Sequence, residues 1–299
     1  GFDEIMNNSL TRKSYYEDNT TFPGENGVKL LNPLSNDLGV MRQTLLYGGL
    51  ESIAYNRNRK HYDLHFYEFG NCYFFEADRK NEGNILSGYS EENHLGLWIC
   101  GDSNPKNWAA PQTKTSVFQL KAHIENILIR LGFTQNQVNF EPVQSGIYAA
   151  GMNIRTYKQQ IGSFGIVSGD ILKKFDIDSD VFFAEMNWDA LLKESSTSEV
   201  RFSEISRFPS VSRDLALLVD KSVTFAAIEQ TAKKTERKLL KAVSLFDVYE
   251  GKNLPEGKKS YAVNFVLQDK EKTLNDKQID AVMQKIQQNL EKELGALLR

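Results

Sequence analysis

The C-terminal third of the chain alternates apolar and polar residues in three segments, at 211–219, 245–249 and 259–267. Successive side chains of a β-strand point to opposite faces of its sheet, so the alternation assigns each residue to a face. The apolar face, expected to form the core, carries Leu215, Leu217, Val219, Phe246, Val248, Tyr261, Val263, Phe265 and Leu267. The opposite face carries Asp214, Ala216, Leu218, Asp247, Tyr249, Ser260, Ala262 and Asn264. This pattern predicts an open floor of small residues beside one aromatic ring and one carboxylate.

Two stretches with helix signals complete the module: one lies between the first and second strands, and the other follows the third. Thr224 is a predicted N-cap of the first helix, and Thr273 with Asp276 resembles a capping box at the start of the second. The second helix is expected to end at Gly295. Residues 296–299 then predict a fourth strand at the edge of the sheet. This β-α-β-β-α-β order is that of a ferredoxin-like fold, which alone names no function.

Composition bounds the class of protein. With 299 residues, 40% of them hydrophobic and 25% charged, the chain can bury sizeable cores and is expected to form two domains. No apolar run approaches the roughly 18 residues of a membrane span. Cys72 and Cys100 are too few and too far apart for a zinc site or a disulfide framework, and we predict two buried thiols and no metal site.

The charge divides unevenly along the chain. Residues 1–200 carry 18 Lys or Arg against 25 Asp or Glu, whereas residues 201–299 carry 18 against 14. The change falls at a polar Ser-Ser-Thr-Ser stretch, 195–198, that suits an exposed linker. We therefore predict domains at 1–198 and 199–299, the second of which has the basic character of a module that faces RNA phosphates. A solvated lysine-rich surface is the alternative interpretation.

The sequence resembles the β subunit of bacterial phenylalanine–tRNA ligases in two places. In the C-terminal module, the ferredoxin-fold anticodon-binding domain of that family is similar to FPSVSRDLALLVD, LFDVYEG, KKSYAVNF and KTLNDKQIDAVMQKI. Upstream, the catalytic-like domain of the same subunit is similar to LLNPLSNDLGVMRQTLLYGGLESIAYNRNR and FYEFGNCYFF. The resemblance implies an α+β fold class: a class II ligase-like antiparallel sheet with helices, followed by a ferredoxin-like βαββαβ domain.

The resemblance also implies an enzyme and its partners. It implies that tRNA(Phe) and the α subunit of the ligase are the partners, in an α2β2 heterotetramer that uses ATP and Mg²⁺ to attach phenylalanine to tRNA. We expect this chain to be a C-terminal piece of a longer, cytoplasmic subunit, with no DNA or membrane partner. The synthetic active site would lie on the α subunit, and the editing site upstream of this chain, so we expect no cofactor to be bound here.

Class II ligases grip ATP with arginines, one on a motif strand and one in a glycine-rich motif, because guanidinium is a planar, permanently charged fork. The corresponding strand here, 66–70, contains no arginine, and neither does the glycine-containing stretch 162–169. We predict that this stretch is a turn between strands rather than a phosphate cradle. No catalytic residue is therefore predicted.

Matching the family motif residue by residue places the anticodon contacts at Ala216, Asp247, Tyr249 and Ser260. Alternation had independently placed these four on the open face. A tyrosine ring offers a stacking plane for an unstacked base, and a carboxylate offers two acceptors to the N1–H and N2–H donors of guanine, with which the phenylalanine anticodon begins. Arg213 and Lys259 are candidate phosphate contacts, although a local ion pair is an equal alternative for Arg213.

Two other classes of function compete. One is a stand-alone ferredoxin-like protein that binds RNA or senses an amino acid, with no ligase partner. A sensor would need a glycine-rich turn between strand and helix, and the corresponding residues 219–225 contain no glycine. The other is an independent ATP-using enzyme, which the missing arginines disfavour.

Overall fold

The structure of this chain is a computed structural model that describes residues 1–299 except 18, 34, 82, 135–136, 196–203 and 252–253. The chain divides into two compact units, Gly1–Val200 and Arg201–Arg299. The predicted boundary at 198 and most of the predicted linker lie outside the described residues.

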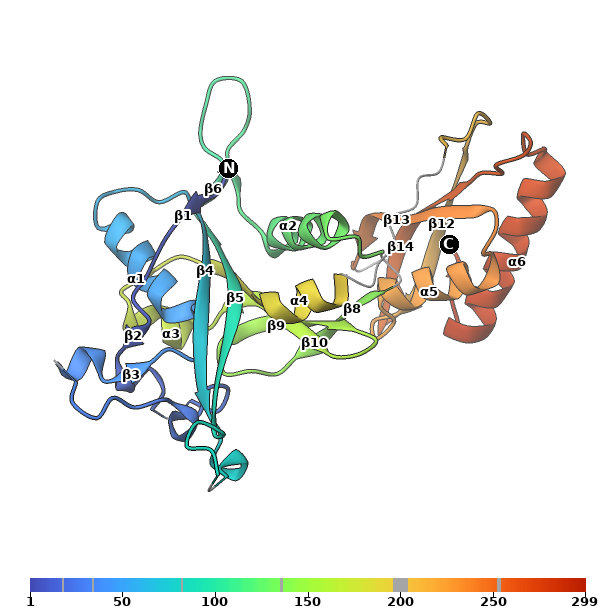
Figure 1. The fold of residues 1–299 in the computed structure, drawn as a ribbon. Coiled ribbons are helices and arrows are strands. Elements are labelled where there is room, and N and C mark those ends of the chain that lie inside the picture. The colour runs from blue at the N-terminus through green and yellow to red at the C-terminus, as the bar shows by residue number, and fades with distance from the viewer. Residues whose placement is uncertain (18, 34, 82, 135–136, 196–203, 252–253) are drawn as a thin grey trace. The chain divides into compact units, whose positions relative to one another are not determined.

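The first unit is built on one sheet of seven strands (Figure 1). Their order is β1 (Asp3–Glu4), β4 (Leu64–Phe75), β5 (Tyr89–Cys100), β11 (Val181–Asn187), β10 (Gln160–Val167), β9 (Tyr148–Thr156) and β8 (Val138–Val143). Neighbouring strands are antiparallel except β1, which pairs with β4 in parallel. The predicted antiparallel sheet with helices is confirmed, with one short parallel strand at its edge.

Helices cover both faces of this sheet. The helices are α1 (Leu46–Arg57), α2 (Val117–Arg130), α3 (Gly169–Lys174) and α4 (Trp188–Ser195). Alternate residues of β11 mark the two sides: Phe183 packs in a core with α1 and α3, whereas Phe182 packs in a second core with α2 and α4. Shorter elements are β2 (Leu10–Thr11), β3 (Val40–Met41), β6 (Asp102–Asn104), β7 (Thr113–Lys114), η1 (Lys13–Tyr15), η2 (Gly24–Asn26), η3 (Asn36–Leu38) and η4 (Ala77–Arg79).

The glycine-containing stretch 162–169 is not the predicted turn. Gly162 and Gly165 lie within β10, and Gly169 begins α3. A Cβ at Gly162 would lie 2.4 Å from the Glu185 carbonyl oxygen, and one at Gly165 would lie 2.3 Å from the Ala150 carbonyl oxygen. These glycines therefore permit close approach of neighbouring backbones inside a buried strand, a role that glycine also has in sheets.

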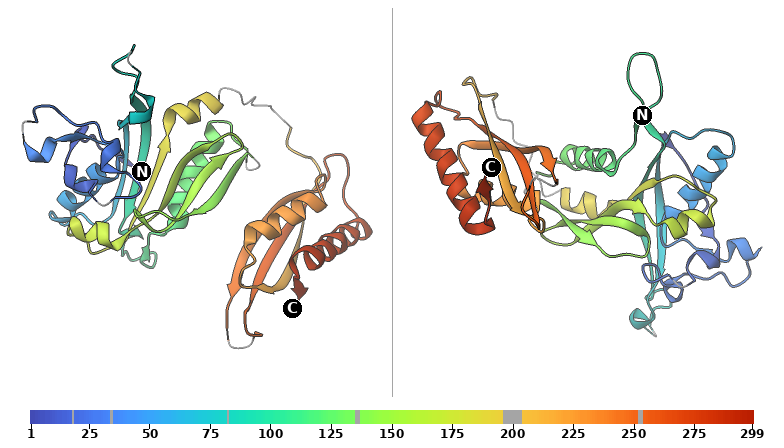
Figure 2. Two further views of the ribbon diagram at one scale, coloured as in Figure 1. Left: turned by 90° about the horizontal axis from the view of Figure 1, so that it is seen from below. Right: turned by 180° about the vertical axis from the view of Figure 1, so that it is seen from behind.

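The second unit has the predicted ferredoxin-like fold (Figure 2). Four strands lie in the order β13 (Leu240–Tyr249), β14 (Lys258–Leu267), β12 (Val211–Asp220) and β15 (Leu297–Leu298), and all the pairs are antiparallel. The helices α5 (Phe225–Thr235) and α6 (Asp276–Leu294) pack together on one face of this sheet. The predicted edge strand is thus confirmed as β15, beside β12. In the described part of this unit, no helix covers the other face.

The prediction that Phe246 and Val248 lie in the core is wrong in part. Phe246 is 60% exposed, because a β-bulge between Leu245 and Asp247 inserts one extra residue into β13. Strict alternation would place Leu245 and Asp247 on the same face. The bulge instead lets Leu245 pack against the core while Asp247 remains on the open face. Val248 pairs with Tyr261 on the helix side, as predicted, but is 47% exposed.

The predicted capping box of the last helix is also wrong. Asn275, not Thr273, is the N-cap of α6: its side chain accepts a hydrogen bond from the Gln278 backbone N–H, and the Gln278 side chain accepts one from the Asn275 N–H. Leu274, immediately before this cap, is buried in the core, which fixes the point at which the helix can begin. Thr224 does cap α5, and Gly295 ends α6 with a left-handed φ of 61°.

Candidate nucleic-acid interface

The open face of the second unit carries two neighbouring rows of directly opposed residues. The first row joins Ala216 of β12, Ala262 of β14 and Asp247 of β13, and the second joins Leu218, Ser260 and Tyr249. Directly opposed side chains lie about 5 Å apart on the same face of a sheet. The structure therefore brings together all four predicted contact residues, Ala216, Asp247, Tyr249 and Ser260, on adjacent rows.

These four residues differ in accessibility. Ala216 and Asp247 are exposed, Tyr249 is half-buried, and Ser260 is only 5% exposed. The Tyr249 ring extends over Gly251, where an added Cβ would lie 2.3 Å from the tyrosine hydroxyl oxygen. Gly251 thus leaves the room that the ring occupies, and the exposed carboxylate of Asp247 lies beside it.

The alternation pattern alone missed Arg299. Its backbone N–H donates a hydrogen bond to the carbonyl oxygen of Ala216, and its guanidinium lies 5.1 Å from the centre of the Tyr249 ring. The side chain therefore reaches from beside β12 across the open face towards β13. The predicted edge strand at 296–299 was the available signal, since pairing it with β12 brings Arg299 beside Ala216.

The two predicted phosphate contacts lie on the other face. Arg213 and Lys259 are opposed to Phe265 and Val219, which belong to the helix-covered core side. Arg213 forms an ion pair with Asp276, at the start of α6, with a nitrogen–oxygen distance of 3.8 Å. Lys259 is only 8% exposed, and its ammonium lies 4.6 Å from the Tyr261 ring. The structure does not bring either residue to the open face.

Comparison with known families was made for the whole chain. The profile of the phenylalanyl tRNA synthetase beta chain CLM domain matches residues 1–188, and that of the ferredoxin-fold anticodon binding domain matches residues 206–299. The chain belongs to the phenylalanyl-tRNA synthetase beta chain family. The resemblance that the sequence motifs suggested is thereby confirmed.

Curated relatives in this family match over the full length of the chain. The chain is 54% identical to the phenylalanine–tRNA ligase beta subunit of Bacteroides fragilis, 50% identical to that of Porphyromonas gingivalis and 32% identical to that of Syntrophotalea carbinolica. Each match covers 100% of this chain and 37% of the relative. The chain therefore spans little more than a third of the length of these relatives.

In the first unit, two sequence motifs of the family resemblance meet in a buried ion pair. Arg42 donates to Glu68 Oε1 at 2.6 Å and to the Asn71 carbonyl oxygen at 2.9 Å, and both charged side chains are at most 7% exposed. An added Cβ at Gly70 would lie 2.1 Å from Arg42 Nη2. Met41-Arg42 and Tyr67-Glu68-Phe69-Gly70, from the two stretches that resemble the family, thus hold β3 and β4 together rather than bind a nucleotide.

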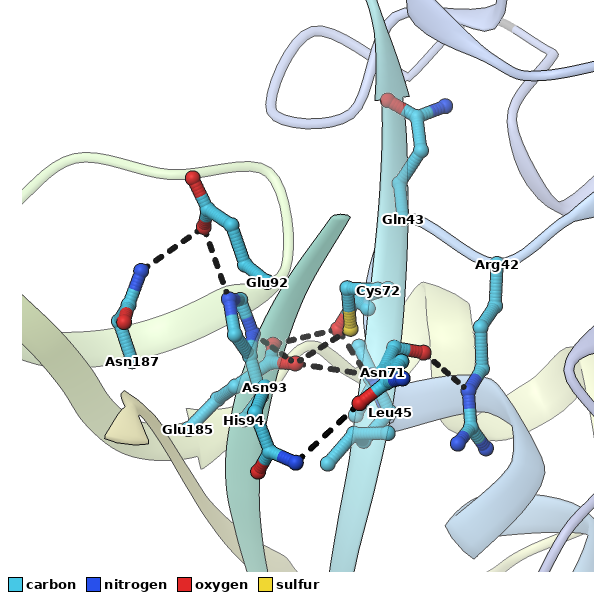
Figure 3. A network of polar contacts seen from close by, with 12 residues as sticks. Arg42, Gln43, Leu45, Asn71, Cys72, Glu92, Asn93, His94, Glu185 and Asn187 are labelled. Atoms are coloured by element: carbon cyan, nitrogen blue, oxygen red, sulfur yellow. Dashed lines mark hydrogen bonds and ion pairs between the residues drawn. The ribbon is translucent and has the colours of Figure 1, made fainter. Parts of the chain in front are cut away.

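A second polar network joins β4, β5 and β11 (Figure 3). Glu185 is buried and accepts hydrogen bonds from Thr44 Oγ1 at 2.6 Å and from the Leu45 N–H at 2.9 Å. The two nitrogens of His94 lie 3.0 Å from Glu185 and 3.1 Å from Glu92. One imidazole ring between two carboxylates is satisfied on both sides only when both nitrogens carry a proton.

The pKa shifts agree with a charged His94. Burial lowers the pKa of His94, but its hydrogen bonds with Cys72, Glu185 and Glu92 together raise it to about 12. Burial raises the pKa of Glu185, but the hydrogen bond and charge of His94 hold it below its ordinary value. His94 is therefore an imidazolium that compensates two carboxylates.

Cys72, His94 and Glu185 also form the one group of potential metal ligands within the described residues, with ligand atoms within 4.8 Å of one another. A metal ion would have to displace a proton from both Cys72 and His94. Burial raises the pKa of the Cys72 thiol to about 11, and that of His94 is equally high. Both protons are held at neutral pH in this network, so a metal ion would bind only by releasing them. Cys72 and Cys100 are both buried free thiols, as predicted.

A cavity of about 590 Å³ adjoins this network in the first unit. The described residues that line it include Glu92 and Glu185 but no arginine or lysine. A triphosphate requires cations, and these carboxylates would repel it. The cavity thus does not suit ATP, which agrees with the absence of arginine from β4 at 66–70 and from β10. Within the described residues, no helix is long and apolar enough to cross a membrane.

Proposed function

We propose that this chain is the C-terminal part of a phenylalanine–tRNA ligase β subunit whose second unit recognises the anticodon of tRNA(Phe). The observation that carries this proposal is the strand register: it aligns Ala216 with Asp247 and Ser260 with Tyr249 on a face that no described helix covers. Family membership and the basic balance of residues 201–299 support the same conclusion.

The chemistry of a single nucleobase suits this face. The ring of Tyr249 supplies a plane on which an unstacked base lies, a contact worth roughly 1 to 3 kcal/mol. Asp247 accepts from two donors, and guanine presents N1–H and N2–H together on its Watson–Crick edge. Ala216 and Ala262 leave room for a flat ring, and Ser260 is directly opposed to Tyr249 in the second row. The expected ligand is the guanine that begins the phenylalanine anticodon.

We propose that the first unit serves assembly with the α subunit, in an α2β2 enzyme that uses ATP and Mg²⁺ to attach phenylalanine to tRNA. Among the described residues, no arginine or lysine lines its cavity, and the one lining cation, His94, is already paired with Glu92 and Glu185, so we assign the synthetic step to the partner subunit. Permanent subunit interfaces are more apolar than ordinary surface. The first unit exposes several large apolar side chains that suit such an interface: Met6, Leu31, Ile85, Leu86, Trp108 and Phe118.

The decisive test is binding of anticodon stem-loop RNAs that differ only in the first anticodon base. Asp247→Asn keeps one acceptor and adds a mismatched donor, so it should weaken binding of the guanine RNA by roughly tenfold and that of the other RNAs much less. Asp214→Asn is the matched control, since it removes the same charge from the same face, where Asp214 is bonded to Asn264. Equal losses for every first base would reject base recognition by this face.

The assembly role is tested separately by co-expression with the α subunit. The complex should co-purify and should survive deletion of residues 201–299. Loss of the complex on that deletion would show that the roles of the two units are reversed.

A further inference from the structure

We propose that Arg299 recognises the acceptor edge of the same guanine, opposite Asp247 at its donor edge. This inference rests on the proposed function, because it assigns a second specificity contact to the same base. It goes beyond the four contacts that the family motif implies, and neither Arg213 nor Lys259 can replace it, since both lie on the helix side.

The geometry begins with the first row of the open face. Asp247 on β13, Ala262 on β14 and Ala216 on β12 are directly opposed, and the Arg299 N–H donates to the Ala216 carbonyl oxygen at 3.0 Å. This row therefore has a carboxylate at one end, a guanidinium at the other and two alanines between them. Neighbouring strands lie about 4.8 Å apart, so the two ends are separated by about 14 Å of backbone spacing.

The Arg299 side chain shortens this span. Its guanidinium extends back over the floor and lies over the Tyr249 ring, 5.1 Å from the ring centre, and Tyr249 lies on β13, the strand of Asp247. The alanines carry nothing beyond Cβ that would obstruct a flat ring between the charged groups. A base that stacks on Tyr249 beside this guanidinium would thus meet Asp247 on one side and Arg299 on another.

Guanine has the matching distribution of groups. Its N1–H and N2–H are donors, whereas O6 and N7 are neighbouring acceptors that a guanidinium can bridge with two hydrogen bonds. In a single-stranded loop both edges are accessible. Adenine offers an amino donor where guanine has O6, and it would place that donor against the guanidinium. Asp247 and Arg299 together would therefore reject adenine at two points.

The test combines protein variants with single-atom changes in the RNA. Wild-type 299-residue chain, Arg299→Ala and Arg299→Lys are titrated with stem-loops that carry guanine, inosine or 7-deazaguanine as the first anticodon base. Inosine lacks the N2 amino group that faces Asp247, and 7-deazaguanine lacks the N7 acceptor. Because a bidentate contact is worth about 1 to 3 kcal/mol, Arg299→Ala should weaken binding of the guanine RNA roughly tenfold, and loss of N7 should weaken wild-type binding by about three- to tenfold.

The decisive measurement is whether the effect of Arg299→Ala on affinity depends on the N7 atom of the base. 7-Deazaguanine should bind Arg299→Ala within about twofold of guanine, whereas inosine should bind it as poorly relative to guanine as it binds wild type. Arg299→Lys keeps the charge but not the fork, so it should restore less than half of the discrimination. Circular dichroism checks that each variant is folded, which is expected because Arg299 is exposed and every variant keeps its backbone N–H.

Two outcomes overturn the proposal. If Arg299→Ala lowers the affinity for guanine and 7-deazaguanine RNAs by the same factor, Arg299 contacts phosphate rather than the base. If Arg299→Ala tightens binding, its guanidinium occupies the place of the base and competes with it. Failure of the proposed function itself is recognised without any Arg299 variant: wild-type chain would then show no preference among first anticodon bases.

Discussion

The sheets of the two units differ in what covers their faces. In the first unit, helices cover both faces, and the charged groups on its central strands are buried in pairs such as Arg42 with Glu68 and His94 with Glu185. In the second unit, helices cover one face, and the charged side chain of Asp247 remains exposed on the other. The buried charged residues Glu68, His94 and Glu185 of the first sheet thus have protein partners, whereas Asp247 of the second sheet is available to a ligand.

This difference gives family motifs two physical roles. A buried charge is costly unless it is paired, so the motif residues of the first unit stabilise the fold that they belong to. An exposed row of side chains contributes little to folding and can be chosen for what it binds. Substitutions should therefore change stability in the first unit and RNA affinity in the second.

The largest effect is expected at the buried pair. Arg42→Ala leaves Glu68 buried without its cation and should lower the free energy of unfolding of the first unit by about 3 to 5 kcal/mol. Urea unfolding followed by tryptophan fluorescence measures it, since all three tryptophans, at 98, 108 and 188, lie in this unit. Arg155→Ala is the control: its pair with Glu141 is half-exposed and 3.7 Å long, and its loss should cost under about 1 kcal/mol. Equal losses would remove the distinction between buried and exposed charges.

Tyr249 should show the opposite behaviour. Tyr249→Ala should weaken anticodon stem-loop binding by about 1 to 3 kcal/mol, whereas Tyr249→Phe keeps the stacking plane and should lose little. Fluorescence anisotropy measures the affinities, and thermal unfolding should show nearly the same stability for all three proteins. A stability loss as large as the affinity loss would mean that the ring supports the fold instead of the ligand.

The His94 network predicts a smaller, pH-dependent effect. The folded pKa of His94 is raised to about 12 from an ordinary value of 6.5, so its stabilisation is complete below pH 6.5 and declines as pH rises above it. Unfolding free energy should fall by about 2 kcal/mol between about pH 6.5 and about pH 8.5. Glu92 and Glu185, with lowered pKa values, titrate below this window, and Cys72, whose pKa rises from 9.0 to about 11, contributes only near its upper end.

His94→Gln is the matched variant for that slope. It removes the titrating group and should flatten the pH dependence, although it also lowers stability at every pH. A slope that persists unchanged in His94→Gln would assign the effect to another group and would show that His94 is neutral in the folded chain.

Much of the second unit follows from its sequence because period-two alternation determines which side chains share a face. Alternation predicts Asp247 and Tyr249 on the open face, and the position of 296–299 after the last helix predicts an edge strand; the structure places both as expected. The same rule argues against Arg213 and Lys259 as RNA contacts, because alternation places them with Leu215 and Tyr261 on the core side. Their charge suits a phosphate, but their position in the strands places them away from the open face.

Contacts between distant segments could not be predicted. Nothing in the spacing of Arg42, Glu68 and Gly70 reveals that the three meet in one buried cluster. Likewise, Cys72 and His94 are brought to Glu185 only by the pairing of β5 with both β4 and β11. Local hydrogen bonding also decided between Thr273 and Asn275 as the cap of α6, because both residue types suit that position.

The smallest effect is expected at the bulge, where the sequence pattern was misleading. If Phe246 belonged to the core, Phe246→Ala would cost about 3 to 5 kcal/mol. Because its side chain is 60% exposed, we expect a change of under about 1 kcal/mol.

Leu245→Ala should cost more, about 1 to 2 kcal/mol, since Leu245 packs against the core although it is only partly buried. The second unit contains no tryptophan, so its unfolding is followed by circular dichroism. If Phe246→Ala proved the costlier change, β13 would have no bulge at 245–247. Strict alternation would then place Leu245 on the open face with Asp247, and the floor on which a base lies would extend by one apolar side chain.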